Sequence, residues 1–193
     1  MSIKNVVVVG GGVLGSQIAY QTAYAGFHTT IYLRSEASVE RARPKVDRLH
    51  AIYVAELTAA KSNPGAPVSR GLVFNAADTA AVNYDELLAR AEKAYQELGY
   101  STDLAAAVND ADLIIEALAE DPKAKTAFYQ QLQPLLPEKT ILATNSSTLL
   151  PSMLADSTGR PEKFLALHFA NNIWSGNTAE VMGHDRTDPT VYD

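Results

Sequence analysis

The sequence contains no cysteine, which excludes disulfide bonds, thiolate metal sites and cysteine nucleophiles and fits a cytoplasmic protein. It also lacks an excess of positive charge, because 16 lysines and arginines stand against 22 aspartates and glutamates, for a formal net charge of −6. A chain without such an excess has little with which to neutralise phosphates, so we expect no nucleic-acid partner.

Long apolar runs are also absent. No run approaches the roughly 18 apolar residues that span a bilayer, and the first run, Val6–Val9, ends in glycines, unlike a signal peptide. We therefore expect no membrane segment. His28, His50 and His184 show no metal-ligand spacing, so we predict no metal site. The 193 residues, 47% of them hydrophobic, suffice for one large globular domain.

A glycine-rich turn follows the valines directly. Its glycines fit the pattern G-x-G-x-x-G, between a short buried strand and a helical stretch from about residue 13 to residue 25. In a dinucleotide site the first glycine allows a tight turn, the second admits the pyrophosphate and the third lets helix and strand pack closely. The alternative is a turn that binds nothing. We predict cofactor contacts from Gly10, Gly12, Val13, Leu14 and Gly15.

The second predicted strand, His28–Leu33, ends where such folds meet the adenosine ribose. A carboxylate normally holds the 2′-hydroxyl there, but this chain has Leu33, followed by Arg34 and Ser35. A cation and a hydroxyl suit a 2′-phosphate, so the sequence favours NADP(H), with NAD(H) as the alternative. In that alternative Arg34 is a solvated surface residue and Glu36 takes the place of the acid.

Residues 36–98 are predicted to form a helical hairpin, with helices at about 36–61 and 84–98. The first helix carries a basic cluster, which is either a solvated face or an attraction for a phosphorylated ligand: Arg41, Arg43, Lys45 and Arg48.

Strands and helices then alternate, which predicts an α/β fold of the Rossmann type: a doubly wound, mostly parallel sheet into which the hairpin is inserted. A dinucleotide-binding domain would cover residues 1–187. Residues 188–193 open with Asp188-Pro189 and read as the start of a helix that the chain does not complete. The expected strands are 112–117, 140–144, 164–169 and 179–183, and the expected helices are 122–136 and 151–155.

Polar side chains follow the later strands, at the edge where open α/β sheets bind ligands. His168 ends one strand, Glu180 lies in the next and Ser147 follows an earlier one. A histidine backed by a carboxylate is a general base, which beside a nicotinamide could take a hydroxyl proton as hydride leaves. The structural alternatives are a buried histidine, a surface ion pair and an N-cap, respectively.

Three stretches around these residues resemble the 3-hydroxyacyl-CoA dehydrogenase family: NSSTL at 145–149, KFLALHFANN at 163–172 and NTAEVMG at 177–183. With the glycine turn and residues 112–117, the resemblance covers nearly the whole chain, as the N-terminal nucleotide-binding domain of the family. Within the family, the amino-acid sequence at 12–19, 145–152 and 165–171 is similar to that of bacterial diketoreductase.

The resemblance implies roles for individual residues. His168 would be the catalytic acid/base, Glu180 its orienting carboxylate and Ser147 a hydroxyl near the 3-oxygen of the substrate. Further implied contacts are Asn145, Glu116 and Lys123 with the nicotinamide and its ribose, and Asn171 with the substrate.

The implied activity is that of an NAD(P)-dependent oxidoreductase that interconverts a 3-hydroxyacyl and a 3-ketoacyl compound, with a coenzyme A thioester as one candidate substrate. The alternatives are a dinucleotide-binding structural or regulatory protein, and a dehydrogenase of a hydroxy acid without coenzyme A, such as a sugar acid or carnitine. The C-terminal helical domain of the family, which forms a homodimer and completes the cleft, is absent, so we expect cofactor binding with little turnover. Asn171-Asn172 replaces the asparagine-proline of the family, which predicts altered access for the acyl chain.

Overall fold

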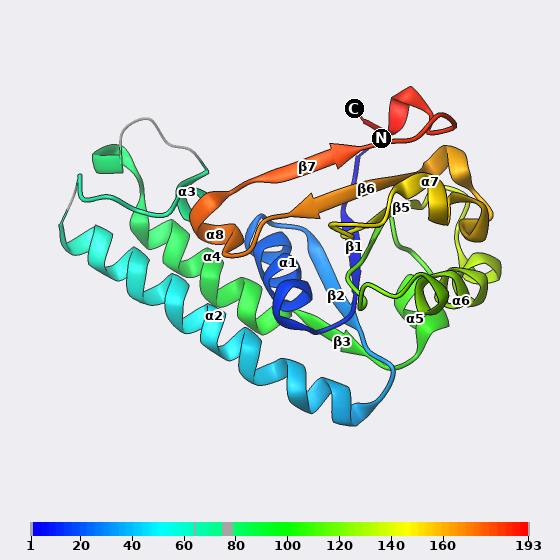
Figure 1. Cartoon of the computed structure of the whole chain (residues 1–193). Coiled ribbons are helices and arrows are strands. Elements are labelled where there is room, and N and C mark those ends of the chain that lie inside the picture. Colours follow the sequence, from blue (N-terminus) through cyan, green and yellow to red (C-terminus); the bar gives the residue numbers. More distant parts are fainter. Residues whose placement is uncertain (1, 64, 75–78, 193) are drawn as a thin grey trace.

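The strands of the computed structural model form one sheet in the order β3-β2-β1-β4-β5-β6-β7 (Figure 1). The structure describes residues 2–63, 65–74 and 79–192. All neighbouring strands pair in parallel except β7, which pairs antiparallel to β6 at the edge. The predicted Rossmann-type sheet is thereby confirmed. The strands are β1 (Asn5–Val9), β2 (His28–Tyr32), β3 (Gly99–Ser101), β4 (Leu113–Glu116), β5 (Ile141–Thr144), β6 (Phe164–Phe169) and β7 (Ala179–Met182).

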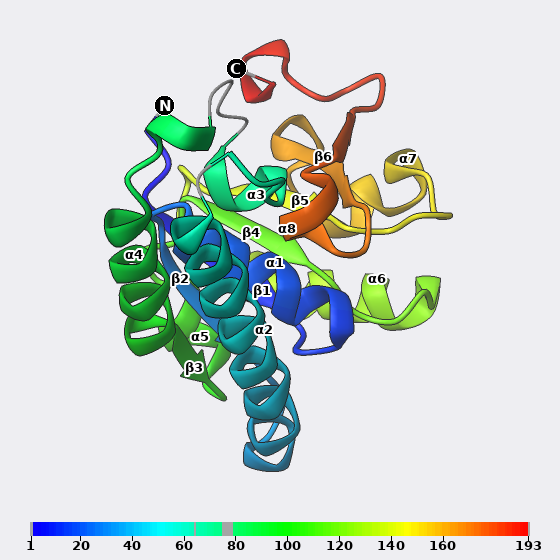
Figure 2. The ribbon, with the colours of Figure 1, turned by 90° about the vertical axis from the view of Figure 1, so that its left-hand side faces the viewer.

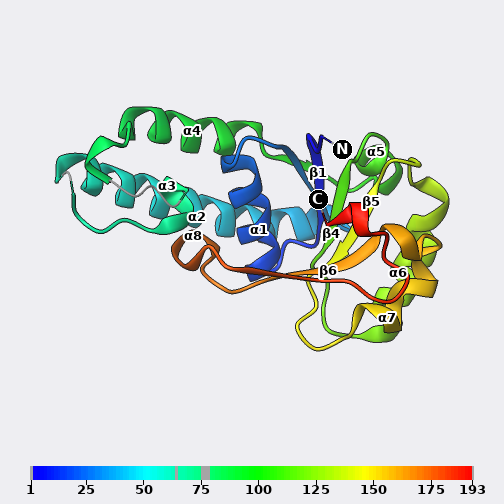
Figure 3. The ribbon, with the colours of Figure 1, turned by 90° about the horizontal axis from the view of Figure 1, so that it is seen from above.

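The unbroken valine run of β1 is explained by helices on both faces of the sheet. Val6 and Val8 enter the core under α1, α2 and α4, whereas Val7 and Val9 enter the core under α5, α6 and α7. Figures 2 and 3 show these two helical layers on opposite sides of the strands. The helices are α1 (Val13–Tyr24), α2 (Glu36–Ser62), α3 (Arg70–Val73), α4 (Tyr84–Glu97), α5 (Leu104–Val108), α6 (Pro122–Leu132), α7 (Pro151–Leu154) and α8 (Ile173–Gly176).

The predicted hairpin consists of α2 and α4, which lie side by side against α1 (Figure 1). Three buried tyrosine rings join α1 to α2: Tyr53 stands edge-on to Tyr20 and Tyr24, with centroids 4.8 and 5.3 Å apart. Edge-to-face packing adds to the burial of such large side chains. The hairpin is therefore a continuation of the core and not a loose insertion.

The structure differs from the sequence-based expectation mainly in its short elements. The three-residue strand β3 and the five-residue helix α5 were not expected, and the helix expected at 122–136 ends at Leu132 and continues as a 3₁₀ turn. At 188–193, Asp188 accepts the N–H of Thr190 at 2.8 Å and caps a 3₁₀ turn at Pro189–Val191. Asp193, and Pro64 in the turn after α2, lie outside the described residues.

Asp112 joins the start of β4 to the start of β1, at the ends of these strands that lie opposite the glycine turn. Its Oδ2 accepts the N–H groups of Lys4 and Asn5 at 2.8 and 2.9 Å, and its Oδ1 lies 2.7 Å from Lys139 Nζ. The hydrogen bond from Lys139, followed by those from the backbone, lowers the pKa of this carboxyl from 3.8 to about 2. The folded pKa is below the unfolded one, so the stabilisation is present above the unfolded pKa and is lost as the pH falls through about 4 to about 2.

We expect Asp112→Asn to lower the free energy of unfolding near neutral pH by about 2 kcal/mol, because each pKa unit corresponds to roughly 1.4 kcal/mol. Urea denaturation of both proteins across the acid range measures the difference. It should shrink as the pH falls from about 4 to about 2. A difference that did not change with pH would contradict a charge-based origin.

Candidate active site

Two glycines of the motif have no room for a side chain in the turn from β1 to α1, and the third faces open space. Gly10 has a φ of +108°, and a Cβ there would lie 2.8 Å from the Ala117 carbonyl oxygen. A Cβ on Gly15 would lie only 2.2 Å from the Gly10 carbonyl oxygen. A Cβ on Gly12 would meet no atom within 4 Å, so open space lies before the first N–H groups of α1. This space and these donors fit a pyrophosphate.

The two residues after this turn present different surfaces. Val13 is 65% exposed beside the open space, whereas Leu14 is half-buried and packs against the core. The side chain of Val13 is therefore available to a dinucleotide, and any contact from Leu14 falls mainly to its backbone.

Leu33 closes the far end of the glycine turn. It is 6% exposed, and its Cδ2 would be 2.9 Å from a Cβ on Gly11. Leu33 thus packs under the glycine turn, where the adenosine is expected. Its side chain has no polar group that could bind the ribose. Arg34 lies exposed beyond it, and Glu36, in the first turn of α2, accepts a hydrogen bond from Thr102 Oγ1 at 3.1 Å.

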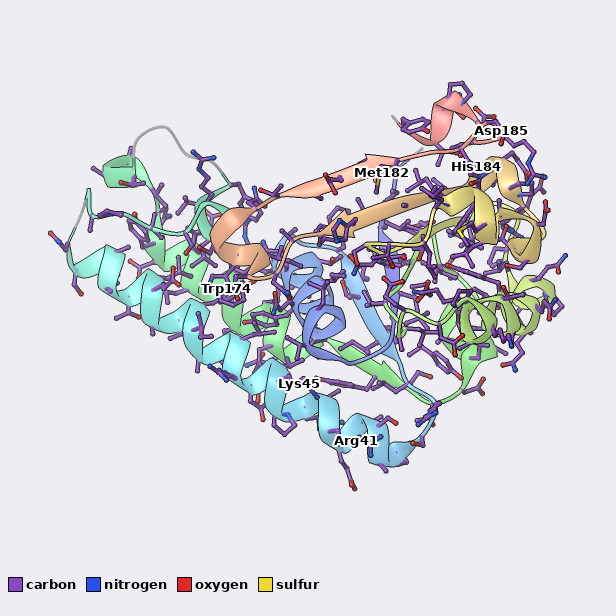
Figure 4. The ribbon with its side chains drawn as sticks, in the orientation of Figure 1. Arg41, Lys45, Trp174, Met182, His184 and Asp185 are labelled. Carbon is purple, nitrogen blue, oxygen red and sulfur yellow. The ribbon has the colours of Figure 1, made fainter. Side chains whose placement is uncertain are left out.

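A cluster of hydroxyls with one arginine lies at the start of α2. Ser35 Oγ and Ser38 Oγ are 3.0 Å apart, and Arg41 Nη2 donates to Ser38 Oγ at 2.9 Å. Figure 4 shows Arg41 near the start of α2. Two other bases of the helix have structural partners: Arg43 covers the Tyr100 ring at 4.5 Å, and Lys45 Nζ donates to the Arg41 carbonyl oxygen. Of the four bases named from the sequence, Arg41 comes first along α2, six residues after the N-cap Ser35.

His168 and Glu180 face each other across the β6–β7 ladder, as a register pair. His168 Nδ1 lies 3.0 Å from Glu180 Oε2, with side chains 26% and 66% exposed. The histidine is therefore neither buried nor isolated. A carboxylate on Nδ1 sets the tautomer in which Nε2 can accept a proton, which is the arrangement of a general base.

Ser147 lies exposed after β5, where it meets Glu120, a residue that the sequence reading did not single out. Glu120 Oε1 accepts the N–H of Ser147 at 2.9 Å, and its Oε2 accepts Ser146 Oγ at 2.7 Å. The N-cap of α7 is Leu150, so the alternative that Ser147 caps this helix is wrong. The Ser147 hydroxyl makes no hydrogen bond within the described part of the chain, so it is available to a ligand.

Several groups act on the Glu120 carboxyl. Partial burial alone would raise its pKa, but the hydrogen bonds from Ser146 and Ser147 and the electrostatic interactions with Lys125 and His168 outweigh burial and lower it. Glu120 therefore carries its negative charge at neutral pH and places it beside the predicted acid/base residue.

Asn145 ties the end of β5 to β6 next to the histidine. Its Oδ1 accepts the N–H of Phe169 at 2.9 Å, its own N–H donates to the Glu116 carbonyl oxygen at 2.7 Å, and it is 9% exposed. The Asn145 side-chain oxygen thus positions the backbone after His168. A contact with the nicotinamide would fall to its side-chain nitrogen.

The prediction that Glu116 contacts the cofactor needs correction, because its side chain is 0% exposed. Its Oε1 lies 2.5 Å from Lys125 Nζ, and its Oε2 accepts Tyr129 OH at 3.0 Å and Thr144 Oγ1 at 2.8 Å. The carboxylate is held from four sides, counting Leu118 N–H at 2.6 Å. Glu116 is a buried structural anion beneath the site.

Lys123 makes no contact with the buried Glu116 carboxylate among the described residues. It lies exposed in the first turn of α6, where its N–H donates to the N-cap Asp121. The lysine that acts on the site is Lys125, whose side chain is 1% exposed and whose charge lowers the pKa of Glu120. Glu120 could have been found from the sequence, since it follows the end of β4 as Ser147 follows β5, whereas nothing in the sequence separates Lys125 from Lys123.

Residues 2–63, 65–74 and 79–192 hold no helix that is long and apolar enough to cross a bilayer. The same residues include no group of three or more His, Cys, Asp or Glu side chains that could hold a metal ion.

A glycine turn that fits a dinucleotide and a histidine–carboxylate pair on one α/β sheet define the class of nucleotide-dependent oxidoreductase domains. The family model described as "3-hydroxyacyl-CoA dehydrogenase, NAD binding domain" matches residues 5–193, so the chain belongs to this family. The description names NAD and gives no support to a preference for NADP.

Individual relatives agree with this assignment. The mitochondrial hydroxyacyl-coenzyme A dehydrogenase of Rattus norvegicus is 31% identical over 99% of this chain and 54% of its own length. A solved diketoreductase acting on dicarbonyl compounds is 47% identical, with a TM-score of 0.80, over 100% of this chain and 59% of its own. The 3-hydroxybutyryl-CoA dehydrogenase of Escherichia coli is 27% identical, with a TM-score of 0.78, over 99% and 34%. The chain thus spans little more than half of the first two proteins.

Proposed function

We propose that this chain is the dinucleotide-binding, proton-transferring part of an oxidoreductase that interconverts a 3-hydroxyacyl and a 3-ketoacyl compound. The observation that carries the proposal is the 3.0 Å contact between His168 Nδ1 and Glu180 Oε2, on the sheet that also carries the glycine turn. Family membership supports the reaction class.

A nicotinamide dinucleotide held at the turn of Gly10, Gly12 and Gly15 would supply the hydride chemistry at the substrate C3. His168 Nε2 takes the proton of the 3-hydroxyl during oxidation and returns it to the 3-oxygen during reduction. Glu180 accepts the hydrogen bond from Nδ1–H and stabilises the imidazolium. Ser147 donates its hydroxyl to the 3-oxygen, and Asn171, exposed just after β6, contacts the substrate.

A steady-state assay of the full-length protein tests the proposal, with a 3-ketoacyl-CoA thioester and a 1,3-dicarbonyl acid offered separately. Turnover of either supports it, and turnover of neither supports the binding-only alternative. The similarity to diketoreductase favours a substrate without coenzyme A, so faster turnover of the free dicarbonyl is the expected result. The homodimer and the cytoplasmic location stay predictions.

We further propose that NADP(H) is the preferred cofactor. The residues after β2 support this: Leu33 supplies no acid for a 2′-hydroxyl, while exposed Arg34, the Ser35–Ser38 hydroxyls and Arg41 form a cationic, hydrogen-bonding cluster beyond it. A 2′-phosphate matches these donors, and a ribose hydroxyl does not need them.

Calorimetric titration of this chain with NADPH and with NADH measures the preference. We expect NADPH to bind roughly tenfold more tightly or better, since hydrogen bonds to charged groups contribute about 1.5–3 kcal/mol. Arg34→Asp should remove the preference, and Arg48→Asp, the same charge change further along α2, should not. Tighter binding of NADH would contradict the role of Arg34. If neither bound, a circular dichroism melt would separate an unfolded chain from one without a cofactor site.

A further inference from the structure

Backbone strain gathers around the segment that follows the predicted catalytic strand. Three non-glycine residues in the described part of the chain have a positive φ: Phe74 (+47°), Asn172 (+59°) and Asn177 (+47°). The first ends α3, and the other two flank α8, which begins five residues after His168. Strained residues persist where the surrounding structure holds them, and they concentrate at functional sites.

Gln17 of α1 holds the start of α8. Its Oε1 accepts the N–H of Asn172 at 2.8 Å and that of Ile173 at 3.4 Å. The side chain of Asn172 makes no capping bond, so the cap of α8 comes from another helix. Gln17 is 6% exposed and lies two residues after Gly15, in the helix that begins at the dinucleotide turn.

Proline could not stand at Asn172 in this structure. It has no N–H to donate to Gln17, and its ring fixes φ near −65°. The acceptor on Gln17 therefore depends on the replacement of the asparagine-proline of the family by Asn171-Asn172, because only a residue with an N–H can donate to it. On its other side, α8 is held by Trp174, whose Nε1 donates to Glu56 Oε1 of α2 at 3.3 Å (Figure 4).

We propose that Gln17 is a positioning residue for the substrate. By capping α8 from the cofactor helix, it keeps Asn171 in register with the dinucleotide turn and with His168, so that substrate and cofactor are oriented through one side chain. This inference rests on the proposed function.

The neighbouring Gln21 offers a matched control, because it has the same side chain one helical turn later and is 8% exposed. Its Oε1 accepts Tyr53 OH, and its Nε2 donates to the Gly71 carbonyl oxygen at 2.9 Å. Both bonds lead to α2 and α3 and not to the backbone of α8. Gln21→Met thus removes buried hydrogen bonds from α1 without uncapping α8.

The experiment compares Gln17→Met, Gln17→Glu and Gln21→Met in the full-length protein, by kcat and KM for the 3-ketoacyl substrate, dinucleotide Kd and thermal melting. Methionine keeps the size of glutamine but removes the acceptor. We expect Gln17→Met to lower kcat/KM by roughly 10- to 100-fold, since small misplacements in a site cost about that much, while the dinucleotide Kd changes by less than about threefold. Gln17→Glu, which keeps an oxygen acceptor, should recover most of the loss, and Gln21→Met should lower the melting temperature with kcat/KM nearly unchanged.

Wild-type kcat/KM in Gln17→Met would overturn the inference. Equal losses in Gln17→Met and Gln21→Met would also overturn it, because they would show a merely structural role. If Gln17→Met did not fold, Gln17→Asn, whose shorter side chain withdraws the oxygen from Asn172, would give the same test. A wild-type protein without turnover would overturn the proposed function and this inference with it, whereas an active wild type with an unaffected Gln17→Met would overturn the inference alone.

Discussion

His168→Ala should lower the kcat of the full-length protein by about 10²- to 10⁴-fold, the range that general acid–base catalysis supplies. In the proposed mechanism the imidazole of His168 accepts the 3-hydroxyl proton, and Glu180 orients that imidazole. Alanine leaves the proton without a base. The dinucleotide Kd should stay within about twofold, because the predicted pyrophosphate site lies at the glycine turn and not on β6. Glu180→Gln should lower kcat as well, by less, since it keeps the imidazole and removes its anionic partner.

Stopped-flow or steady-state kinetics and a titration with reduced dinucleotide measure the two quantities separately. His28→Ala is the matched control, because His28 lies exposed at the start of β2, at the opposite ends of the strands. Unchanged turnover in His168→Ala would remove the acid–base assignment, and an equal loss in both variants would point to a fault in folding.

Two alanine substitutions in the glycine motif should fail in different ways. A Cβ on Gly15 would lie 2.2 Å from the Gly10 carbonyl oxygen, so Gly15→Ala must push α1 away from β1. We expect a loss of roughly 1–3 kcal/mol or more in the free energy of unfolding, as for overpacked cores, together with loss of dinucleotide binding. Gly12→Ala adds a methyl group in open space and should leave stability within about 0.5 kcal/mol. It should weaken binding at least about tenfold, because that space is the predicted place of the pyrophosphate.

Urea denaturation and calorimetric titration of both variants distinguish these outcomes. If Gly12→Ala bound the dinucleotide as well as the wild type, the pyrophosphate would not lie over this turn. If Gly15→Ala were as stable as the wild type, the contact between α1 and β1 would be looser than the structure shows.

The glycine turn and the valine strand were predictable because their signals are local. Four adjacent β-branched residues and three glycines at fixed spacing allow few backbone arrangements, and the structure adopts one of them. Pairing His168 with Glu180 depended instead on the family resemblance, because the β6–β7 register involves residues twelve positions apart. β3 has only three residues, too few for an alternating pattern to show.

Glu116 shows where sequence reasoning failed. A carboxylate at the end of a parallel strand is typical of a ligand-binding group, and the sequence gives no sign that this one is enclosed. Its burial depends on Lys125 and Tyr129 of α6 and on Thr144 of β5, whose side chains converge only after the helix has packed. For the same reason Lys123 and Lys125, two residues apart, could not be told apart before the packing of α6 was known.

The position of β7 has a further consequence. This strand pairs on one side only, and all four of its residues are exposed. Outer strands of this kind detach in local fluctuations that need far less free energy than global unfolding. On the proposed mechanism, each such fraying event separates Glu180 from His168 while the Rossmann sheet stays intact. Activity would then depend on how stably β7 stays paired with β6. Any domain or subunit that covers this edge of the sheet would keep His168 and Glu180 in contact.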